Sequence, residues 1–222
     1  MVSGILVYSA SRLCVLFIKL GEDSMSDNRL ASVSRKTSET DITLSLNLDG
    51  AGVSEVDTGI GFFDHMLKSF AKHGFFDMNL QAKGDLYVDS HHTIEDTGIV
   101  LGQAIKQAVG DKAGIRRYGS FLMPMDESLV LCAVDLSGRP YLSYDLNLST
   151  PRVGYFDTEM VKEFFYAVSY AAEMNLHIKQ ISGANDHHII EATFKAFANA
   201  LDLATRMDPS LDGEILSTKG SL

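Results

Sequence analysis

Two copies of the pattern His-His-x-x-Glu are the residues of this chain best suited to metal chemistry. One copy occupies residues 91–95 and the other residues 187–191, an offset of 96. Imidazole nitrogens and carboxylate oxygens bind divalent metal ions, and residues four apart lie on one face of an α-helix. His91 and Glu95 can therefore reach one ion, whereas His92 points about 100° away from His91 and would serve another ion.

The recurrence extends beyond these motifs. The tripeptide Met-Asn-Leu at 78–80 returns at 174–176, and Thr97 returns as Thr193, again with an offset of 96. A repeat at constant spacing indicates an internal duplication. We therefore expect one metal-binding unit in each half of the chain. Isolated histidines could instead begin helices or form hydrogen bonds in the core, but two copies in phase argue against that interpretation.

Composition limits the classes of protein and partner. The chain has 222 residues, 45% of them hydrophobic, and a net charge of −10. This balance predicts a globular core and argues against a generic binder of nucleic acid or of anionic membranes. Two cysteines without paired spacing indicate a reducing compartment, so we expect a cytoplasmic protein.

The chain divides into four segments. Residues 1–25 are rather apolar, but Arg12 and Lys19 interrupt them, so we reject a transmembrane helix. We expect this segment to be a dispensable extension, with a targeting leader as the alternative. The remaining segments are a first metal-binding half at 26–112, a second metal-binding half at 113–210 and a C-terminal tail at 211–222.

Hydrophobic periodicity predicts an α+β fold. Apolar residues alternate in half-buried strands and recur every three or four positions in amphipathic helices, and the two halves repeat the same order. We expect helices at 61–72, 93–109, 158–171 and 188–206, and strands at 42–48, 75–83, 120–136, 141–148 and 174–181. An internally duplicated unit, in which two mixed β-sheets sandwich four helices, is the economical architecture.

Eight residues are candidate metal ligands. His65 in the first predicted helix of one half and Glu163 in that of the other lie upstream of the motifs at matching places. Mixed imidazole and carboxylate ligands without thiolates favour manganese, iron or zinc, and manganese suits an octahedral site. Two six-coordinate ions would leave four positions open for water or substrate. The ligands are His65, His91, His92, Glu95, Glu163, His187, His188 and Glu191.

Six motifs follow one another between about Arg29 and Leu222. They are Thr58–Leu67, His91–Asp96, Pro124–Glu127, Asp135–Pro140, Asn185–His188 and Ser217–Gly220. Together these motifs resemble the imidazoleglycerol-phosphate dehydratase family. At the position of Glu163 some relatives carry histidine; because a carboxylate also binds manganese, we keep Glu163 as a ligand.

The resemblance implies a hydro-lyase that removes water from imidazole glycerol phosphate to give imidazole acetol phosphate in histidine biosynthesis. It also implies two Mn²⁺ per active site and a homo-oligomer of 24 subunits whose sites are shared between neighbours. The carbon that loses a proton in this reaction has no adjacent carbonyl, so the electrons must come from the imidazole ring. Metal coordination favours the ring deprotonation that this requires.

Proton transfer needs a further residue near the metals. The resemblance places Glu39 at a substrate-contacting position, which makes it our preferred proton-transfer residue, with Glu127 as its counterpart in the second half. Asp126 and His73 are alternatives, although Asp126 could be a surface or capping residue and His73 could end a helix. His177 lies in a predicted strand, where we expect it to pack structurally. The expected catalytic set is Glu39, His65, His91, His92, Glu95 and Glu191.

Phosphate recognition is assigned to cations and hydroxyls far from the histidines in sequence. An arginine can pair two phosphate oxygens, a lysine provides a point charge and a serine adds a donor. Arg116 is an alternative to Arg117, and we expect the tail to fold over a site on the same or another subunit. The expected substrate-binding set is Glu39, His65, His73, His91, Glu95, Arg117, Arg139, His187, Ser217, Thr218 and Lys219.

Two rival functions could use the same ligands. A metal-dependent phosphohydrolase would use the ions to activate water and would release inorganic phosphate. A metal-stapled scaffold without activity would have closed coordination shells and no open position. The dehydratase instead requires ions whose coordination shells are completed by substrate or solvent.

Overall fold

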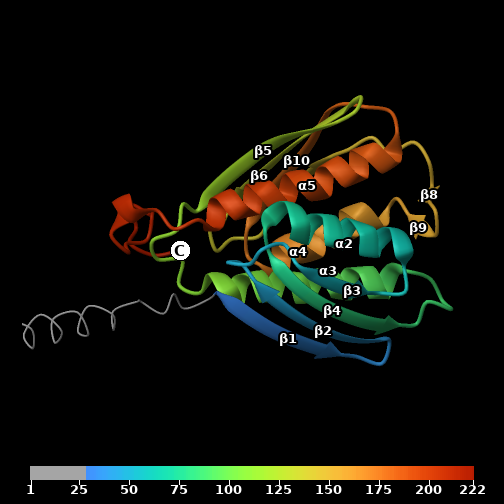
Figure 1. The fold of residues 1–222 in the computed structure, drawn as a ribbon, viewed down its shortest axis with the longest axis horizontal. Helices are drawn as coiled ribbons and strands as arrows, with labels where there is room; N and C mark the ends of the chain where they lie inside the picture. The colour runs from blue at the N-terminus through green and yellow to red at the C-terminus, as the bar shows by residue number, and fades with distance from the viewer. Residues whose placement is uncertain (1–28) are drawn as a thin grey trace, which may run out of the picture.

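The computed structural model describes residues 29–222, in which two β-sheets enclose a layer of four helices (Figure 1). The predicted N-terminal extension at 1–25 lies outside the described residues. The predicted α+β architecture is confirmed. One sheet lies below the helical layer in Figure 1 and the other above it.

The first half forms one sheet and two helices. Its strands β1 and β2, and β2 and β4, are antiparallel, while β3 and β4 are parallel, so the order in the sheet is β1-β2-β4-β3. The chain reaches β4 from β3 through helix α2, and helix α3 follows β4. The elements are β1 (Leu30–Lys36), β2 (Thr40–Asn47), β3 (Ser54–Asp57), α2 (Gly61–Gly74), β4 (Asp77–Gly84) and α3 (His91–Val109).

The second half repeats this topology. Its sheet has the order β5-β6-β10-β7, again with two antiparallel pairs and one parallel pair. A short hairpin of β8 (Arg152–Val153) and β9 (Phe156–Asp157) precedes α4. The matching topology agrees with the predicted duplication. The remaining elements are β5 (Tyr118–Met125), β6 (Ser128–Asp135), β7 (Tyr141–Asp145), α4 (Met160–Ala171), β10 (Asn175–Ser182), α5 (Asp186–Thr205) and the 3₁₀ turn η1 (Pro209–Leu211).

Element boundaries differ from the predictions in three respects. Strands β1 and β3 were not predicted, because only Ala31 of β1 is buried and β3 has only four residues. The predicted strand at 120–136 is a hairpin of two strands. Both motif-bearing helices begin two residues earlier than expected, so His91 and His187 lie in the first helical turn.

Helices from opposite halves pack against each other. α3 packs on α4, and α2 packs on α5, while α3 and α5 also cover the inner faces of their own sheets. Gly98 permits the close approach of α3 to α4, since a Cβ at this position would lie 2.8 Å from the carbonyl oxygen of Phe164. Rings such as Phe164 and Phe194, with centroids 5.2 Å apart, fill the space between. This cross-half packing determines which predicted ligands can meet.

Candidate functional site

One group of three side chains that could hold a metal ion joins the two halves of residues 29–222. It contains His65 from α2 together with His187 and Glu191 from α5, and their ligand atoms all lie within 4.8 Å of one another. Oε2 of Glu191 is 3.2 Å from Nε2 of His187 and 3.5 Å from Nε2 of His65. Two imidazoles and one carboxylate form a donor set that suits manganese, iron or zinc. The packing of α2 on α5 brings this set together.

Glu191 is the buried acid of this group. Its side chain is 9% exposed, and Nζ of Lys195 lies 2.8 Å from its Oε1. Burial raises the pKa of Glu191, but the hydrogen bond and charge of Lys195, together with His65 and His187, outweigh burial, and the pKa lies below its ordinary value. Burial and the charge of Lys195 also lower the pKa of His73 on α2. Lys195 is absent from the predicted site residues, although its spacing of four from Glu191 is a signal that could have found it.

The first-half motif lies at the exposed start of α3. Nε2 of His91 is 3.7 Å from Oε2 of Glu95, so these two side chains share a helical face as predicted. The duplication would place Glu163 of α4 beside this motif, because α4 packs on α3 as α2 packs on α5. Within residues 29–222, however, no third ligand completes a group around His91 and Glu95. The role of Glu163 therefore stays a prediction.

The second histidine of each motif faces other carboxylates. Nδ1 of His92 lies 3.1 Å from Asp85, and its Nε2 lies 3.8 Å from Glu39. Nδ1 of His188 lies 2.8 Å from Glu127. The hydrogen bond that Nδ1 of His92 donates to the Asp85 carboxylate raises the pKa of His92, and the one that Nδ1 of His188 donates to Glu127 raises the pKa of His188. Glu39 and Glu127, predicted counterparts, thus both lie beside the second histidine of their motif.

The predicted phosphate-binding residues also gather, in a cavity of about 740 Å³ beneath the C-terminal tail. Nε of Arg117 donates to Asp135 at 2.7 Å, and its Nη1 donates to the carbonyl of Leu216 at 2.8 Å, so this arginine holds the tail in place. Arg116 instead pairs with Asp208 at 3.5 Å and does not line the cavity. The predicted residues in the lining are Arg117, Arg139, Ser217, Thr218 and Lys219.

This cavity and the histidine motifs lie at opposite ends of the molecule. The backbone N–H of Arg117 donates to the carbonyl of Ala204, in the last turn of α5, whereas His187 lies in the first turn. With a rise of 1.5 Å per residue, these two ends of α5 are separated by about 25 Å. Figure 1 shows the same separation, with the C-terminus at one end of the helical layer and the starts of α3 and α5 at the other.

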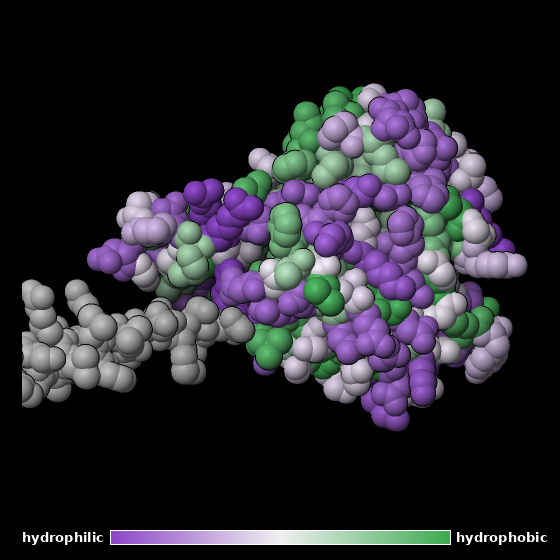
Figure 2. All heavy atoms as spheres, viewed as in Figure 1, coloured by the Kyte–Doolittle hydropathy of each residue, from purple (hydrophilic) through white to green (hydrophobic). Residues whose placement is uncertain are grey.

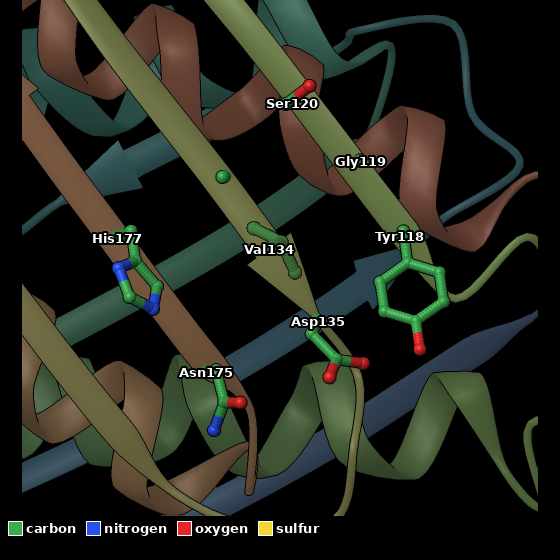
Figure 3. Close-up of a pocket in the computed structure, with 8 residues that line it drawn as sticks. Tyr118, Gly119, Ser120, Val134, Asp135, Asn175 and His177 are labelled. Atoms are coloured by element: carbon green, nitrogen blue, oxygen red, sulfur yellow. The ribbon is translucent and has the colours of Figure 1, made fainter.

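A second pocket, of about 310 Å³, opens on the outer face of the second sheet. Figure 3 shows Tyr118 and Asp135 on neighbouring strands, with Asn175 and His177 on β10. His177 packs at the surface, where its ring centroid lies 5.7 Å from that of Tyr141, because its alternate position in β10 directs it outward and leaves it exposed. This outward direction was not predicted. The sequence signal was the alternation itself, since the neighbours of His177 in the strand are buried.

The exposed surface is largely hydrophilic, as expected for a chain with a net charge of −10. Hydrophilic residues predominate over α2 and α5 in the middle of the face drawn in Figure 2. None of the described helices is both long enough and apolar enough to cross a membrane. The free thiol of Cys132 is buried in β6, and burial raises its pKa.

Comparison with known proteins decides the family. The family model described as imidazoleglycerol-phosphate dehydratase matches residues 58–201, which include both histidine motifs. The chain belongs to the imidazoleglycerol-phosphate dehydratase family. Among the family's curated members, the dehydratase of Lachnoclostridium phytofermentans is 70% identical over 195 residues, 88% of this chain and 99% of that protein. That of Acetivibrio thermocellus is 62% identical over 88% of this chain and 100% of that protein.

Solved structures of the family share the fold. The crystal structure of imidazoleglycerol-phosphate dehydratase from Staphylococcus aureus matches with a TM-score of 0.74 and 43% identity, covering 81% of this chain and 99% of that one. The enzyme from Pyrococcus furiosus matches with a TM-score of 0.75 and 38% identity, covering 86% of this chain and 100% of that one. The duplicated two-sheet architecture is therefore that of the dehydratase family.

Proposed function

We propose that the chain is a metal-dependent hydro-lyase that converts imidazole glycerol phosphate to imidazole acetol phosphate in histidine biosynthesis. The observation that carries the proposal is the group of His65, His187 and Glu191, built across the two halves of a chain that belongs to the dehydratase family. A ring nitrogen of the substrate can occupy an open position on an ion that this group holds.

The proposed cofactor is a pair of Mn²⁺ ions per active site. The donor set fits, because imidazoles and carboxylates in the absence of thiolates suit octahedral manganese. When bound, such ions favour loss of a proton from the substrate imidazole and neutralise the charge that develops. The proposed ligands are His65, His91, His92, Glu95, Glu163, His187, His188 and Glu191.

We place the proton transfers on Glu39. Its carboxylate is about half exposed and 3.8 Å from Nε2 of His92, so it can approach both solvent and a substrate held beside that imidazole. Asp126 stands 3.7 Å from Nε2 of His188 in the equivalent region of the second half and is the alternative. His73 remains a candidate contact to the substrate. The substrate would also be contacted, directly or through the ions, by four predicted metal ligands: His65, His91, Glu95 and His187.

The proposed active site is shared between subunits. The phosphate-binding cavity and the metal ligands of one chain are about 25 Å apart along α5, which is too far for one small substrate to span. A complete site therefore needs the phosphate-binding residues of one copy, which we call the clamp residues (Arg117, Arg139, Ser217, Thr218 and Lys219), beside the metal ligands of another copy. We propose a homo-oligomer, with 24 subunits as the assembly, located in the cytoplasm and without nucleic-acid or membrane partners.

The experiment that tests the function is a product assay. Purified chain loaded with Mn²⁺ should convert imidazole glycerol phosphate to the ketone without releasing inorganic phosphate. Release of phosphate would instead support the metal-dependent phosphohydrolase. Metal uptake with neither product would support the non-catalytic scaffold.

Substitution of the motif carboxylates tests the ligand assignment. Glu95→Ala and Glu191→Ala should each reduce bound Mn²⁺, measured by atomic absorption on the gel-filtered protein, and reduce turnover by at least about 100-fold. Lys162→Ala on the exposed face of α4 is a matched surface control. Unchanged metal content and turnover in either carboxylate variant would remove that residue from the ligand set.

A further inference from the structure

The two metal-binding motifs differ in what supports their carboxylates. In the second half, Lys195 follows Glu191 by four residues on α5 and donates to Oε1 at 2.8 Å. The other oxygen, Oε2, faces the imidazoles of His187 and His65. One oxygen is thus occupied by the lysine, and the other points to the position that an ion would take.

The first half lacks this support. With the offset of 96 residues, the counterpart of Lys195 is Ile99, which cannot donate a hydrogen bond. The side chain of Glu95 is 44% exposed, against 9% for Glu191, and its one charged neighbour within 4 Å in residues 29–222 is His91. The duplicated motifs are therefore unequal. The Glu191 carboxylate is held by Lys195, whereas the Glu95 carboxylate has no such partner and can rotate.

We propose that Lys195 is a positioning residue that fixes the direction of the Glu191 carboxylate, so that Glu191 ligates its ion through Oε2 alone. A carboxylate held by a second hydrogen bond keeps its ligating oxygen in place before the ion arrives. Glu95, without such a partner, can bind through one or both oxygens. The inference rests on the proposed metal site and adds a difference between its two halves.

Charge and orientation have opposite effects on this site. The positive charge of Lys195 repels a divalent cation, while its hydrogen bond orients the ligand. The lysine contacts the oxygen that faces away from the two imidazoles, which keeps its charge on the far side of the carboxylate from the ion. Orientation therefore dominates, and removal of Lys195 should weaken metal binding rather than strengthen it.

The test compares Lys195 with its counterpart Ile99. Mn²⁺ would be titrated into the metal-free full-length chain, and the concentration of free Mn²⁺ would be measured by electron paramagnetic resonance. Lys195→Met should lower the affinity of one class of Mn²⁺ site by about 10-fold to 100-fold, the usual cost of removing an outer partner of a metal ligand. Lys195→Arg should restore affinity to within a few-fold of the wild type, and Ile99→Met should change neither class.

A spectroscopic measurement separates positioning from a general loss of structure. Infrared carboxylate bands of the Mn²⁺-loaded protein report whether a carboxylate binds through one or two oxygens, and Lys195→Met should shift one such band toward two-oxygen binding. Lys195→Leu, a second side chain that cannot donate a hydrogen bond, provides the replacement if the methionine variant folds poorly. Circular dichroism and the melting temperature of each variant control for folding.

The outcomes distinguish this inference from the proposed function. Equal or tighter Mn²⁺ binding in a folded Lys195→Met or Lys195→Leu variant overturns the positioning role. Failure of the wild-type chain to take up Mn²⁺ overturns the proposed metal site itself, and the inference with it. Weaker binding that Lys195→Arg rescues, together with the infrared shift, supports the inference.

Discussion

At the residue scale, the chemistry of each histidine motif depends on which carboxylate every imidazole meets. Adjacent histidines on a helix point in different directions, so His187 joins Glu191 and His65, while His188 turns to Glu127. The spacing of the motif predicts this divergence. It does not predict the partners, because Glu127 lies in a hairpin that is remote in sequence.

Glu39 can be tested apart from the metal ligands. Glu39→Gln keeps the size and a hydrogen-bonding group but cannot accept a proton, so kcat should fall by about 100-fold to 10,000-fold. The same change at Glu127, 2.8 Å from Nδ1 of His188, should lower Mn²⁺ affinity as well, because it alters the partner of a proposed ligand. Stopped assays with metal analysis would separate the two effects. A Glu39→Gln variant with normal kcat would transfer the role to Asp126.

Asp77 provides a prediction of pH dependence outside the site. Its Oδ1 accepts backbone hydrogen bonds from Ala51 and Val53, both at 2.9 Å, and these lower its pKa. The pKa of Asp77 is lower in the folded chain than in the unfolded chain, so its ionised carboxylate stabilises the fold. This stabilisation is complete above the unfolded-state pKa, near 4, and is lost as the pH falls through the folded-state pKa. Asp77→Ala should therefore destabilise the chain at neutral pH by about 1 kcal/mol, allowing for solvent screening.

The measurement is urea unfolding of the wild type and Asp77→Ala between pH 2 and pH 7. The difference in the free energy of unfolding should shrink as the pH falls. Asp77→Asn retains an acceptor oxygen and should give an intermediate loss with little pH dependence. A difference that stays constant across the acid range would show that the charge of Asp77 does not support the loop.

At the element scale, the pairing of helices across the halves decides which ligands meet. α2 belongs to the first half in sequence but packs on α5 of the second, and α4 likewise packs on α3. His65 therefore completes the motif of the other half. The sequence predicted His65 as a ligand, but its partner motif depends on packing between amphipathic faces, which periodicity alone does not pair.

The α3–α4 contact can be tested at Gly98. A Cβ there would lie 2.8 Å from the backbone oxygen of Phe164 and from Cβ of Ala167, so Gly98→Ala should separate the helices and cost about 1–3 kcal/mol. Gly61→Ala is the matched control, because a Cβ at the exposed start of α2 meets no atom within 4 Å. Its free energy of unfolding should change by less than about 1 kcal/mol, in the stabilising direction. Urea unfolding measures both; equal effects would refute the packing argument.

At the scale of the whole molecule, the proposed metal ligands and the proposed phosphate-binding cavity occupy opposite ends of one chain. α5 runs the full length between them, from His187 to the turn that Arg117 contacts. No rearrangement of side chains can close a separation of about 25 Å. This separation supports the proposal that the active site is shared between copies, as in the oligomer implied by the resemblance.

Complementation between defective chains tests the shared site. Glu191→Ala removes a metal ligand and Arg139→Ala removes a clamp residue, so each variant alone should be nearly inactive. Co-expressed with different tags and purified as mixed assemblies, they should recover up to about a quarter of wild-type activity, since some sites draw both intact parts from different chains. Mixed assemblies that stay as inactive as the single variants would place both parts of the site in one chain.

The sequence by itself determined the duplication, the four helices and most of the strands, and it predicted the metal-binding side chains, because periodicity and motif spacing are local properties of the chain. It also grouped Arg117, Arg139 and the tail residues, which line one cavity in the structure. It did not determine the outward direction of His177, the lysine beside Glu191 or the union of His65 with the second motif. Those depend on contacts between residues far apart in the chain, and only the tertiary packing of helices and sheets decides them.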